Sequence, residues 1–156
     1  MQNKKTIGIT GAGGSLGKAL TKIYRSYGYE VIGFTHNKNP QELVKGGPNE
    51  WVYWECGKES LLENSLIKLD ILILNHGIYE SKQDLEKSIE INAMSNIKIL
   101  KLFEKISLSQ PIDSSPKEIW INTSEAEILP ALNPYYEISK SLIGQVVTFK
   151  KNFNNQ

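Results

Sequence analysis

A tyrosine and a lysine stand four residues apart in the segment "YEISK", as Tyr136 and Lys140. Residues four apart on a helix share one face, so the lysine ammonium group can lie beside the phenol. A free tyrosine has a pKa of about 10 and exchanges its proton poorly at neutral pH, whereas a neighbouring positive charge favours the phenolate. The pair is therefore a candidate for acid–base catalysis, although a packed aromatic ring and a solvated lysine would show the same spacing.

A glycine-rich turn lies near the N-terminus, where Gly11, Gly14 and Gly17 are spaced three apart in "TGAGGSLG". The turn follows a predicted strand and opens a predicted helix, which is the context in which such a turn binds the pyrophosphate of a dinucleotide. The start of that helix, at Ser15 and Leu16, offers backbone N–H groups and a dipole that favours negative charge. The sequence thus predicts a dinucleotide site, in preference to an ordinary glycine turn.

The segment after the second predicted strand bears on the choice of dinucleotide. Rossmann domains specific for NAD place an acidic residue there to bind the ribose hydroxyls, whereas those specific for NADP need cations or neutral donors for the 2′-phosphate. This chain has Thr35, His36, Asn37 and Lys38, with no acid among them. We therefore predict NADP(H), with NAD and a merely solvated polar loop as the alternatives.

These features resemble those of the short-chain dehydrogenase/reductase family, whose glycine turn also begins Thr-Gly. The spacing "TGxxGxxG" is more usual in the extended members, and the single-domain members usually have glycine at the position of Ser15. The segment "LNHG" resembles the family's "NNAG" and matches it at Asn75 and Gly77, which are thereby implied to line the cofactor. His76 replaces a small residue of that motif, so a structural histidine is expected there rather than a general base.

The resemblance also supplies partners for the tyrosine–lysine pair. Ser124, twelve residues before Tyr136, and Asn92, in "EINAMSN", match the serine and asparagine of the family's active site. The resemblance implies that Tyr136 transfers the proton and that Lys140 supports it and binds the nicotinamide ribose. It further implies that Ser124 holds the substrate oxygen and that Asn92 holds a water. The family's serine is more often one residue farther from the tyrosine, which leaves Thr123 as an alternative.

Short apolar runs alternate with segments of helical period, a pattern typical of βαβ units around a parallel sheet. We predict an α/β fold: a doubly wound, Rossmann-type parallel sheet of about five strands in the order 3-2-1-4-5, in three layers α/β/α. A loop with at most one helical turn is expected over 36–50. The expected inner face of the first helix carries Leu16, Leu20, Ile23 and Tyr24. Strands are expected at Thr6–Thr10, Glu30–Thr35, Trp51–Trp54, Asp70–Asn75 and Lys117–Thr123, and helices at Ser15–Tyr27, Ser60–Leu69, Asp84–Ile106 and Pro134–Phe149.

The chain has 156 residues, which fits one domain. The resemblance covers Lys5 to Phe149, and the segments "WVYWECGKE", "LNHGI" and "NTSEAE" resemble the reductase portion of cyanobacterial sterol desaturase/short-chain dehydrogenase proteins. In the family, a sixth strand, a proline-glycine motif and a seventh strand follow the helix that carries the tyrosine. We therefore expect a single NAD(P)-binding domain over 1–156 that is incomplete at its C-terminus.

Composition excludes several classes of partner. The formal net charge is +1, which gives no electrostatic reason for nucleic acid binding. The apolar runs are too short to span a bilayer, so no membrane segment is expected. Cys56 is the only cysteine, which excludes an internal disulfide and a cysteine zinc site, and no metal is expected. The N-terminus shows no signal peptide, which predicts a cytoplasmic protein.

Two functions are compatible with these residues. The first is an NADP(H)-dependent oxidoreductase of the short-chain dehydrogenase type, which transfers a hydride between nicotinamide and a small-molecule carbonyl or alcohol. The second is a nucleotide-binding module without turnover, because the elements that close the family's substrate pocket are missing from this sequence. A homo-oligomer is left open.

Overall fold

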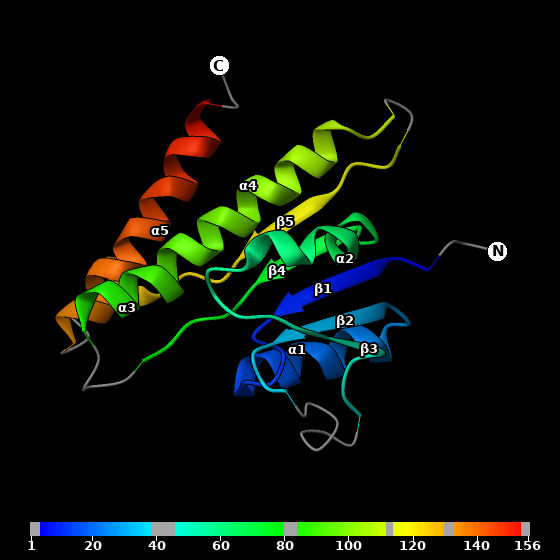
Figure 1. The fold of residues 1–156 in the computed structure, drawn as a ribbon, viewed down its shortest axis with the longest axis horizontal. Coiled ribbons are helices and arrows are strands. Elements are labelled where there is room, and N and C mark those ends of the chain that lie inside the picture. The colour runs from blue at the N-terminus through cyan, green and yellow to red at the C-terminus, as the bar shows by residue number, and fades with distance from the viewer. Residues whose placement is uncertain (1–3, 39–45, 80–83, 112–113, 130–132, 154–156) are drawn as a thin grey trace. The chain divides into compact units, whose positions relative to one another are not determined.

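The computed structural model describes residues 4–38, 46–79, 84–111, 114–129 and 133–153. Its sheet has five parallel strands in the order β3-β2-β1-β4-β5, which confirms the predicted topology (Figure 1). The register places Ile7 of β1 beside Val31 of β2 and Ile71 of β4. The strands are β1 Thr6–Thr10, β2 Glu30–Thr35, β3 Glu50–Tyr53, β4 Ile71–Leu74 and β5 Glu118–Ile121.

The chain divides into two compact units. The first comprises residues 1–76 and 99–122 and contains the whole sheet, and the second comprises residues 77–98 and 123–156. Each unit has its own set of candidate functional residues, and the two are described separately below.

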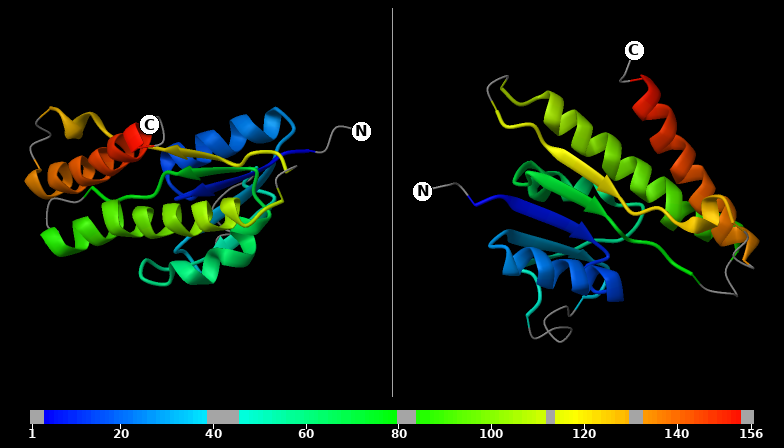
Figure 2. Two further views of the ribbon diagram at one scale, coloured as in Figure 1. Left: turned by 90° about the horizontal axis from the view of Figure 1, so that it is seen from above. Right: turned by 180° about the vertical axis from the view of Figure 1, so that it is seen from behind.

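The first unit buries both faces of its sheet, as a parallel sheet requires. Helix α1, Ser15–Ser26, covers one face, and α2, Glu63–Ile67, covers the other together with the part of α4 that begins at Ile99 (Figure 2). Burying each large side chain contributes roughly 1.5–3 kcal/mol. The larger core joins β2 and β4 to α4, to α2 and to the 3-10 turn before α2 through Phe34, Leu62, Leu66, Leu72, Leu74, Ile99 and Phe103. The smaller core contains Ile7, Ile9, Val31, Ile71 and Ile73 of β1, β2 and β4, against which Leu20 and Tyr24 of α1 pack.

The predicted inner face of α1 is wrong in half of its members. Leu16 and Ile23 are 49% and 47% exposed, whereas Leu20 packs against the sheet and Gly17 is buried. The inner face is thus rotated toward the side that carries Gly17. The reason is steric: only a residue without a side chain fits where the helix meets the glycine turn.

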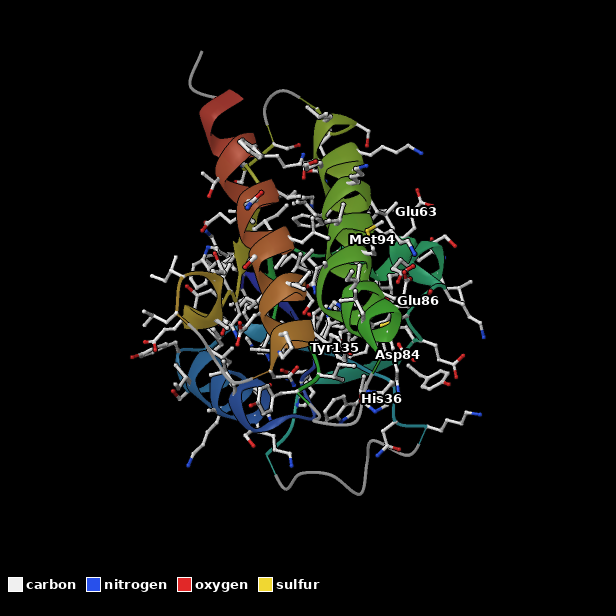
Figure 3. The ribbon with its side chains drawn as sticks, turned by 90° about the vertical axis from the view of Figure 1, so that its left-hand side faces the viewer. His36, Glu63, Asp84, Glu86, Met94 and Tyr135 are labelled. Atoms are coloured by element: carbon white, nitrogen blue, oxygen red, sulfur yellow. The ribbon has the colours of Figure 1, made fainter. Side chains whose placement is uncertain are left out.

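The second unit contains a break that the sequence did not predict. The single helix expected over Asp84–Ile106 is instead α3, Leu85–Ile89, a π-helical turn, Glu90–Met94, and α4, Ser95–Leu108. Asp84 caps α3 by accepting a hydrogen bond from the Lys87 N–H at 2.7 Å (Figure 3). In the π turn, the Asn96 side-chain amide donates to the carbonyl oxygen of Asn92 at 3.1 Å. A side chain thus satisfies a carbonyl in the turn that interrupts the α-helical pattern.

Other boundaries differ modestly. The predicted helix Ser60–Leu69 is a 3-10 turn, Glu59–Leu62, followed by α2. The last helix, α5, begins at Pro134 as predicted and runs to Phe153. A short 3-10 turn, Glu125–Glu127, follows β5 and was not predicted. The helical turn allowed for in the loop after β2 bears mainly on residues 39–45, which lie outside the described residues.

Candidate functional site

The glycine turn of the first unit leaves no room for side chains. Gly11 has φ of +64°, and a Cβ there would lie 3.0 Å from the Cα of His76. A Cβ on Gly17 would overlap the Gly11 carbonyl oxygen and lie 2.7 Å from the Cα of Ala12. A Cβ on Gly14 would lie 3.3 Å from the same oxygen, a tight but far milder contact. Gly11 and Gly17 are therefore required by the fold of the turn, whereas Gly14 is less constrained.

The N-terminus of α1 lacks the groups that usually cap a helix. Its N-cap residue is Gly14, no side chain bonds to the first turn, and that turn, which begins with Ser15 and Leu16, contains no acid. Both of these residues are exposed. Backbone N–H groups at such an end, together with the helix dipole, suit a phosphate, so the residues present fit the pyrophosphate of a dinucleotide.

The last residue of β2 is buried, and the three residues after it are more accessible. Thr35 is buried, and its hydroxyl accepts a hydrogen bond from the Asn37 N–H at 3.1 Å, which closes a tight turn. His36, labelled in Figure 3, is exposed. Lys38 is also exposed, and Asn37 is half-buried. The polar side chains proposed for the 2′-phosphate therefore include two that are open to solvent.

An acidic residue that the sequence reading passed over lies in the same unit. Glu55 accepts a hydrogen bond from Lys58 at 2.7 Å and another from Tyr53. These two bonds, with smaller contributions from the charges of Lys58 and Lys38, hold the pKa of the exposed Glu55 carboxyl below its usual value. The charge that Lys38 would offer to a phosphate is thus opposed in part by a carboxylate, which Lys58 itself neutralises.

The end of β4 is fixed by one hydroxyl group. The Thr10 hydroxyl oxygen accepts hydrogen bonds from the N–H groups of Asn75, at 2.8 Å, and His76, at 3.2 Å, and lies 2.9 Å from Nδ1 of His76. The His76 ring also meets the Trp54 ring edge to face, with centroids 5.1 Å apart. The Asn75 side-chain oxygen accepts from Asn122 at 3.1 Å. These contacts support the expectation that His76 is structural.

The second unit brings together the four residues expected to act in catalysis: Asn92, Ser124, Tyr136 and Lys140, which we call the acid–base cluster. The Tyr136 hydroxyl donates to the Ser124 Oγ at 3.4 Å. The Lys140 ammonium lies 5.9 Å from the centre of the Tyr136 ring, one helical turn along α5. Thr123, the alternative to Ser124, is exposed. The geometry therefore favours Ser124 as the partner of Tyr136.

Neighbouring side chains restrain the Tyr136 ring. Tyr79 meets it edge to face with ring centroids 4.9 Å apart. At the backbone, the Tyr136 N–H donates to the Asn133 side chain at 3.1 Å, next to Tyr135 in the first turn of α5 (Figure 3). The Tyr136 ring is thus packed against a neighbouring aromatic ring, and its main chain is held in the first turn of α5.

Lys140 is buried, with 6% of its surface exposed. Burial lowers its pKa, because the charged form is desolvated, while the negative charge of Glu127 acts in the opposite direction. Gly77 closes over this region: a Cβ there would lie 3.6 Å from the Lys140 Nζ and 2.9 Å from the Asn92 Oδ1. The glycine predicted to approach the cofactor therefore also makes room for two members of the cluster.

Asn92 is fully buried and its amide is engaged in the protein. Its Oδ1 accepts from the Ile78 N–H at 2.7 Å, and its Nδ2 donates to the Ile78 carbonyl at 3.0 Å and to the Ser139 Oγ at 3.0 Å. Ser139 in turn donates to the Tyr136 carbonyl at 2.8 Å. Asn92 thus ties the segment after β4 to the turn of α5 that carries Tyr136, and the water expected on it stays a prediction.

The sequence reading missed three residues beside the cluster: Ser139, Glu127 and Gly144. Ser139 gave no signal, because a serine within a helix has many ordinary roles. Glu127 did give one: the spacing Ser-x-x-Glu from Ser124 is that of a capping box, and the structure contains it. Gly144 gave a weaker one, as a poor helix former inside a predicted helix.

Two further kinds of feature are absent from the described residues. None of the helices there is long and apolar enough to cross a membrane. Within the same ranges, no three histidine, cysteine or acidic residues gather as metal ligands would.

A parallel sheet in this order, with its glycine turn between β1 and α1, is the arrangement of the short-chain dehydrogenase/reductase type of Rossmann protein, which confirms the expected resemblance. More particularly, the chain belongs to the NAD-dependent epimerase/dehydratase family, whose model matches residues 7–146. Membership implies a nicotinamide cofactor.

Individual relatives agree with this placement. The chain is 34% identical over 155 residues to monoglucosyldiacylglycerol epimerase of Synechocystis, and the match covers 94% of this chain and 37% of that protein. Among solved structures, it resembles a 3-oxoacyl-[acyl-carrier protein] reductase from Brucella melitensis (TM-score 0.77, 14% identity, covering 94% of this chain and 68% of that one). It also resembles serine dehydrogenase from Escherichia coli (TM-score 0.78, 17% identity, covering 94% and 75%). At these identities the structural matches show the fold alone.

Proposed function

We propose that the chain is the catalytic nicotinamide-binding part of an NADP(H)-dependent enzyme that transfers a hydride between the nicotinamide and a carbonyl or alcohol carbon. The observation that carries this proposal is the contact between the Tyr136 hydroxyl and Ser124, 3.4 Å long, with the Lys140 ammonium 5.9 Å from the same ring. An isolated tyrosine–lysine spacing has many ordinary explanations. A phenol that meets both a serine hydroxyl and a buried lysine has the parts of a proton-transfer site.

Three residues of the cluster, Tyr136, Ser124 and Lys140, each have one task in this proposal. The bound nicotinamide supplies or accepts the hydride. In the reductive direction Tyr136 gives its hydroxyl proton to the substrate oxygen as the carbonyl carbon gains the hydride, and in the oxidative direction it takes that proton back. Ser124 donates a hydrogen bond to the same oxygen. Lys140 stabilises the phenolate that Tyr136 becomes, because an ammonium group favours a nearby negative charge.

The preference for NADP(H) is a finer part of the proposal. It rests on the segment Thr35 to Lys38, which has no acid to receive ribose hydroxyls and has one exposed lysine for a 2′-phosphate. The carboxylate of Glu55 weakens this preference, although its hydrogen bonds to Lys58 and Tyr53 already occupy it.

Epimerisation is a second candidate, favoured by the family and by the relative that is named an epimerase. The same residues would serve: Tyr136 removes the hydroxyl proton as the carbinol carbon loses its hydride, and returns the proton after the hydride is given back to the opposite face. No net oxidation occurs, so the two candidates differ in whether the nucleotide is consumed. The substrate that this similarity suggests is monoglucosyldiacylglycerol.

The test uses the purified chain in two assays. In the first, NADPH is mixed with a panel of ketones, aldehydes and acyl thioesters, and its absorbance at about 340 nm is followed. In the second, the chain is incubated with NADP⁺, or with NAD⁺, and monoglucosyldiacylglycerol, and the sugar is identified by chromatography. Oxidation of NADPH supports reduction, and a new sugar epimer with unchanged nucleotide supports epimerisation. Nucleotide binding with neither product would favour the module without turnover.

A further inference from the structure

The side chain of Glu127 connects two elements of the second unit. It closes the 3-10 turn Glu125–Glu127 by accepting a hydrogen bond from the Ser124 N–H at 3.2 Å. Within the same turn the Ser124 Oγ accepts from the Ala126 N–H at 3.2 Å. Ser124 is therefore held at its backbone and at its hydroxyl, and that hydroxyl is the group that Tyr136 contacts.

The position of the Glu127 carboxylate depends on a glycine in α5. A Cβ built on Gly144 would overlap the Glu127 Oε2 and would lie 3.0 Å from its Oε1. Gly144 does not have a positive φ, so its backbone does not require glycine. Glycine is a poor residue for the middle of a helix, and the gap that it leaves is filled by the carboxylate. The glycine is thus explained by the space that Glu127 needs.

Charge gives Glu127 a second connection to the cluster. Lys140 lies one helical turn before Gly144 on α5 and is buried. The Glu127 charge raises the pKa of Lys140 and so opposes the larger, lowering effect of burial. The carboxylate therefore favours the ammonium form that supports a phenolate.

We propose that Glu127 is a positioning residue of the acid–base cluster: seated in the gap at Gly144, it holds Ser124 in place for Tyr136. This inference rests on the proposed function, since Ser124 matters only if Tyr136 transfers a proton. It makes a pair of residues, Glu127 and Gly144, depend on each other, although neither would touch the substrate.

The first measurement is independent of turnover. Amide hydrogen exchange at Ser124 is followed by NMR in the wild type and in Glu127→Ala, Glu127→Gln and Gly144→Ala. Exchange should become at least about tenfold faster in Glu127→Ala and in Gly144→Ala, because each removes the acceptor from its place. It should change little in Glu127→Gln, whose amide oxygen still accepts the bond. Unchanged exchange in both Glu127→Ala and Gly144→Ala would overturn the proposal.

The second measurement uses NADPH and whichever carbonyl compound of the panel the wild type reduces. We expect kcat to fall roughly 10- to 100-fold in Glu127→Ala and in Gly144→Ala, with NADPH affinity unchanged, because a displaced hydroxyl no longer supports the reaction. The double variant should be no slower than Glu127→Ala alone. Glu125→Ala, which removes an exposed carboxylate of the same turn, is the matched control and should keep the wild-type kcat.

The outcomes separate the two proposals. A wild type without turnover, together with fast Ser124 exchange in the variants, contradicts the proposed function but not the contact. Turnover in the wild type with an unaltered kcat in Glu127→Ala overturns the positioning role. Gly144→Ala improves the helix propensity of α5, so a loss of kcat there does not come from a weaker helix. Multiplying losses in the double variant would show that the two residues act separately and would also overturn the inference.

Discussion

At the scale of single residues, Tyr136 is the side chain whose surroundings say most. Its hydroxyl meets Ser124, its ring meets Tyr79, and Lys140 lies on the same face of α5. Each contact comes from a different segment of the second unit. Helix α5 by itself places Lys140 beside the phenol, but Ser124 and Tyr79 reach it only through the folding of the second unit, which is why the proposed chemistry is centred there.

The cofactor preference is tested at Thr35. Aspartate at this position keeps the hydrogen bond from the Asn37 N–H, because its carboxylate accepts in the same way as the threonine hydroxyl. The added charge should repel a 2′-phosphate and bind ribose hydroxyls instead. Thr35→Asp should therefore weaken NADPH binding and strengthen NADH binding, each by roughly tenfold, a change of about 1.4 kcal/mol.

Fluorescence titrations of both nucleotides on wild type and Thr35→Asp, at one fixed salt concentration, provide the measurement. Lys38→Met serves as a companion variant: it should weaken NADPH alone, since a charge-assisted contact contributes about 1.5–3 kcal/mol. Equal affinity of the wild type for NADH and NADPH would contradict the NADP assignment and leave the Rossmann fold untouched.

The burial of Lys140 predicts a dependence of stability on pH. Its folded pKa lies below its ordinary value of 10.5 because burial disfavours the charge, so the unfolded chain binds the proton more tightly. The burial of Lys140 therefore makes the wild type more stable as the pH rises through the folded pKa of this residue toward about 10.5. Denaturant unfolding of the wild type and Lys140→Met at pH 7 and pH 9.5 isolates it. The free energy of unfolding of the wild type, relative to that of Lys140→Met, should be larger at pH 9.5 than at pH 7. A smaller difference at pH 9.5 would mean that folding stabilises the ammonium form.

The sequence predicted the candidate site residues but not the neighbouring side chains that hold them in place. Gly11, Tyr136 and Lys140 follow from spacing, and Ser124 and Asn92 from the resemblance. The support of Asn92 by Ser139 depends on how α5 packs beside the segment after β4, which no local pattern encodes. The spacing of Ser124 and Glu127 predicts a capping box, which the structure contains. The contact of Glu127 with Gly144 could not be predicted, because it depends on how the 3-10 turn packs against α5.

At the scale of elements, the glycine turn contains one glycine that the fold requires, Gly17, and one that we expect to matter for nucleotide binding, Gly14. A Cβ on Gly17 would overlap backbone, whereas one on Gly14 would lie 3.3 Å from the nearest oxygen. Gly17→Ala should therefore lower the free energy of unfolding by about 1–3 kcal/mol. Gly14→Ala should fold almost normally but bind NADPH at least about tenfold more weakly, since its methyl group would stand where we propose that the pyrophosphate approaches.

Thermal unfolding and NADPH titration of both variants check this division, with Lys18→Ala, exposed on the same helix, as the control. A Gly14→Ala protein with wild-type affinity would mean that the pyrophosphate does not lie at this turn. A Gly17→Ala protein of undiminished stability would mean that the turn has room that the geometry denies.

The strands were predicted from the sequence more accurately than one of the helices. Strand order followed from short apolar runs that alternate with helical periods, and all five strands were found within one or two residues of their predicted ends. The helix over Asp84–Ile106 was predicted whole, because apolar periodicity continues through "EINAMSN" and no glycine or proline marks a break. The π turn there is stabilised by the hydrogen bond from the Asn96 side chain to the carbonyl of the buried Asn92. The spacing of apolar residues gives no information about such polar contacts.

At the scale of the whole molecule, cofactor binding should be visible as stability. A ligand at 100 times its dissociation constant stabilises the folded state by about 2.7 kcal/mol. For a chain of this size that corresponds to a rise in Tm of roughly 5–10 °C. Calorimetry with NADPH, NADH and adenosine at one common, high concentration checks the effect. No shift with either dinucleotide would contradict nucleotide binding by this chain.

The chain spans 37% of the length of the curated relative that it matches, so any activity of a whole protein of that length is a proposal. The glycine turn, at which we propose the nucleotide binds, belongs to the first unit, and the acid–base cluster belongs to the second. Binding and turnover are therefore separable by mutation: changes at Gly14 should act on affinity, and changes at Tyr136 on rate.

The most direct test of the account is the variant Tyr136→Phe, measured for NADPH affinity and for turnover in the assay in which the wild type is active. Removing the hydroxyl removes the proton donor and leaves every residue of the glycine turn unchanged, so kcat should fall by about 100-fold or more while the dissociation constant changes by less than about twofold. Turnover near the wild-type rate in Tyr136→Phe would show that Tyr136 does not transfer the proton and would contradict the central claim.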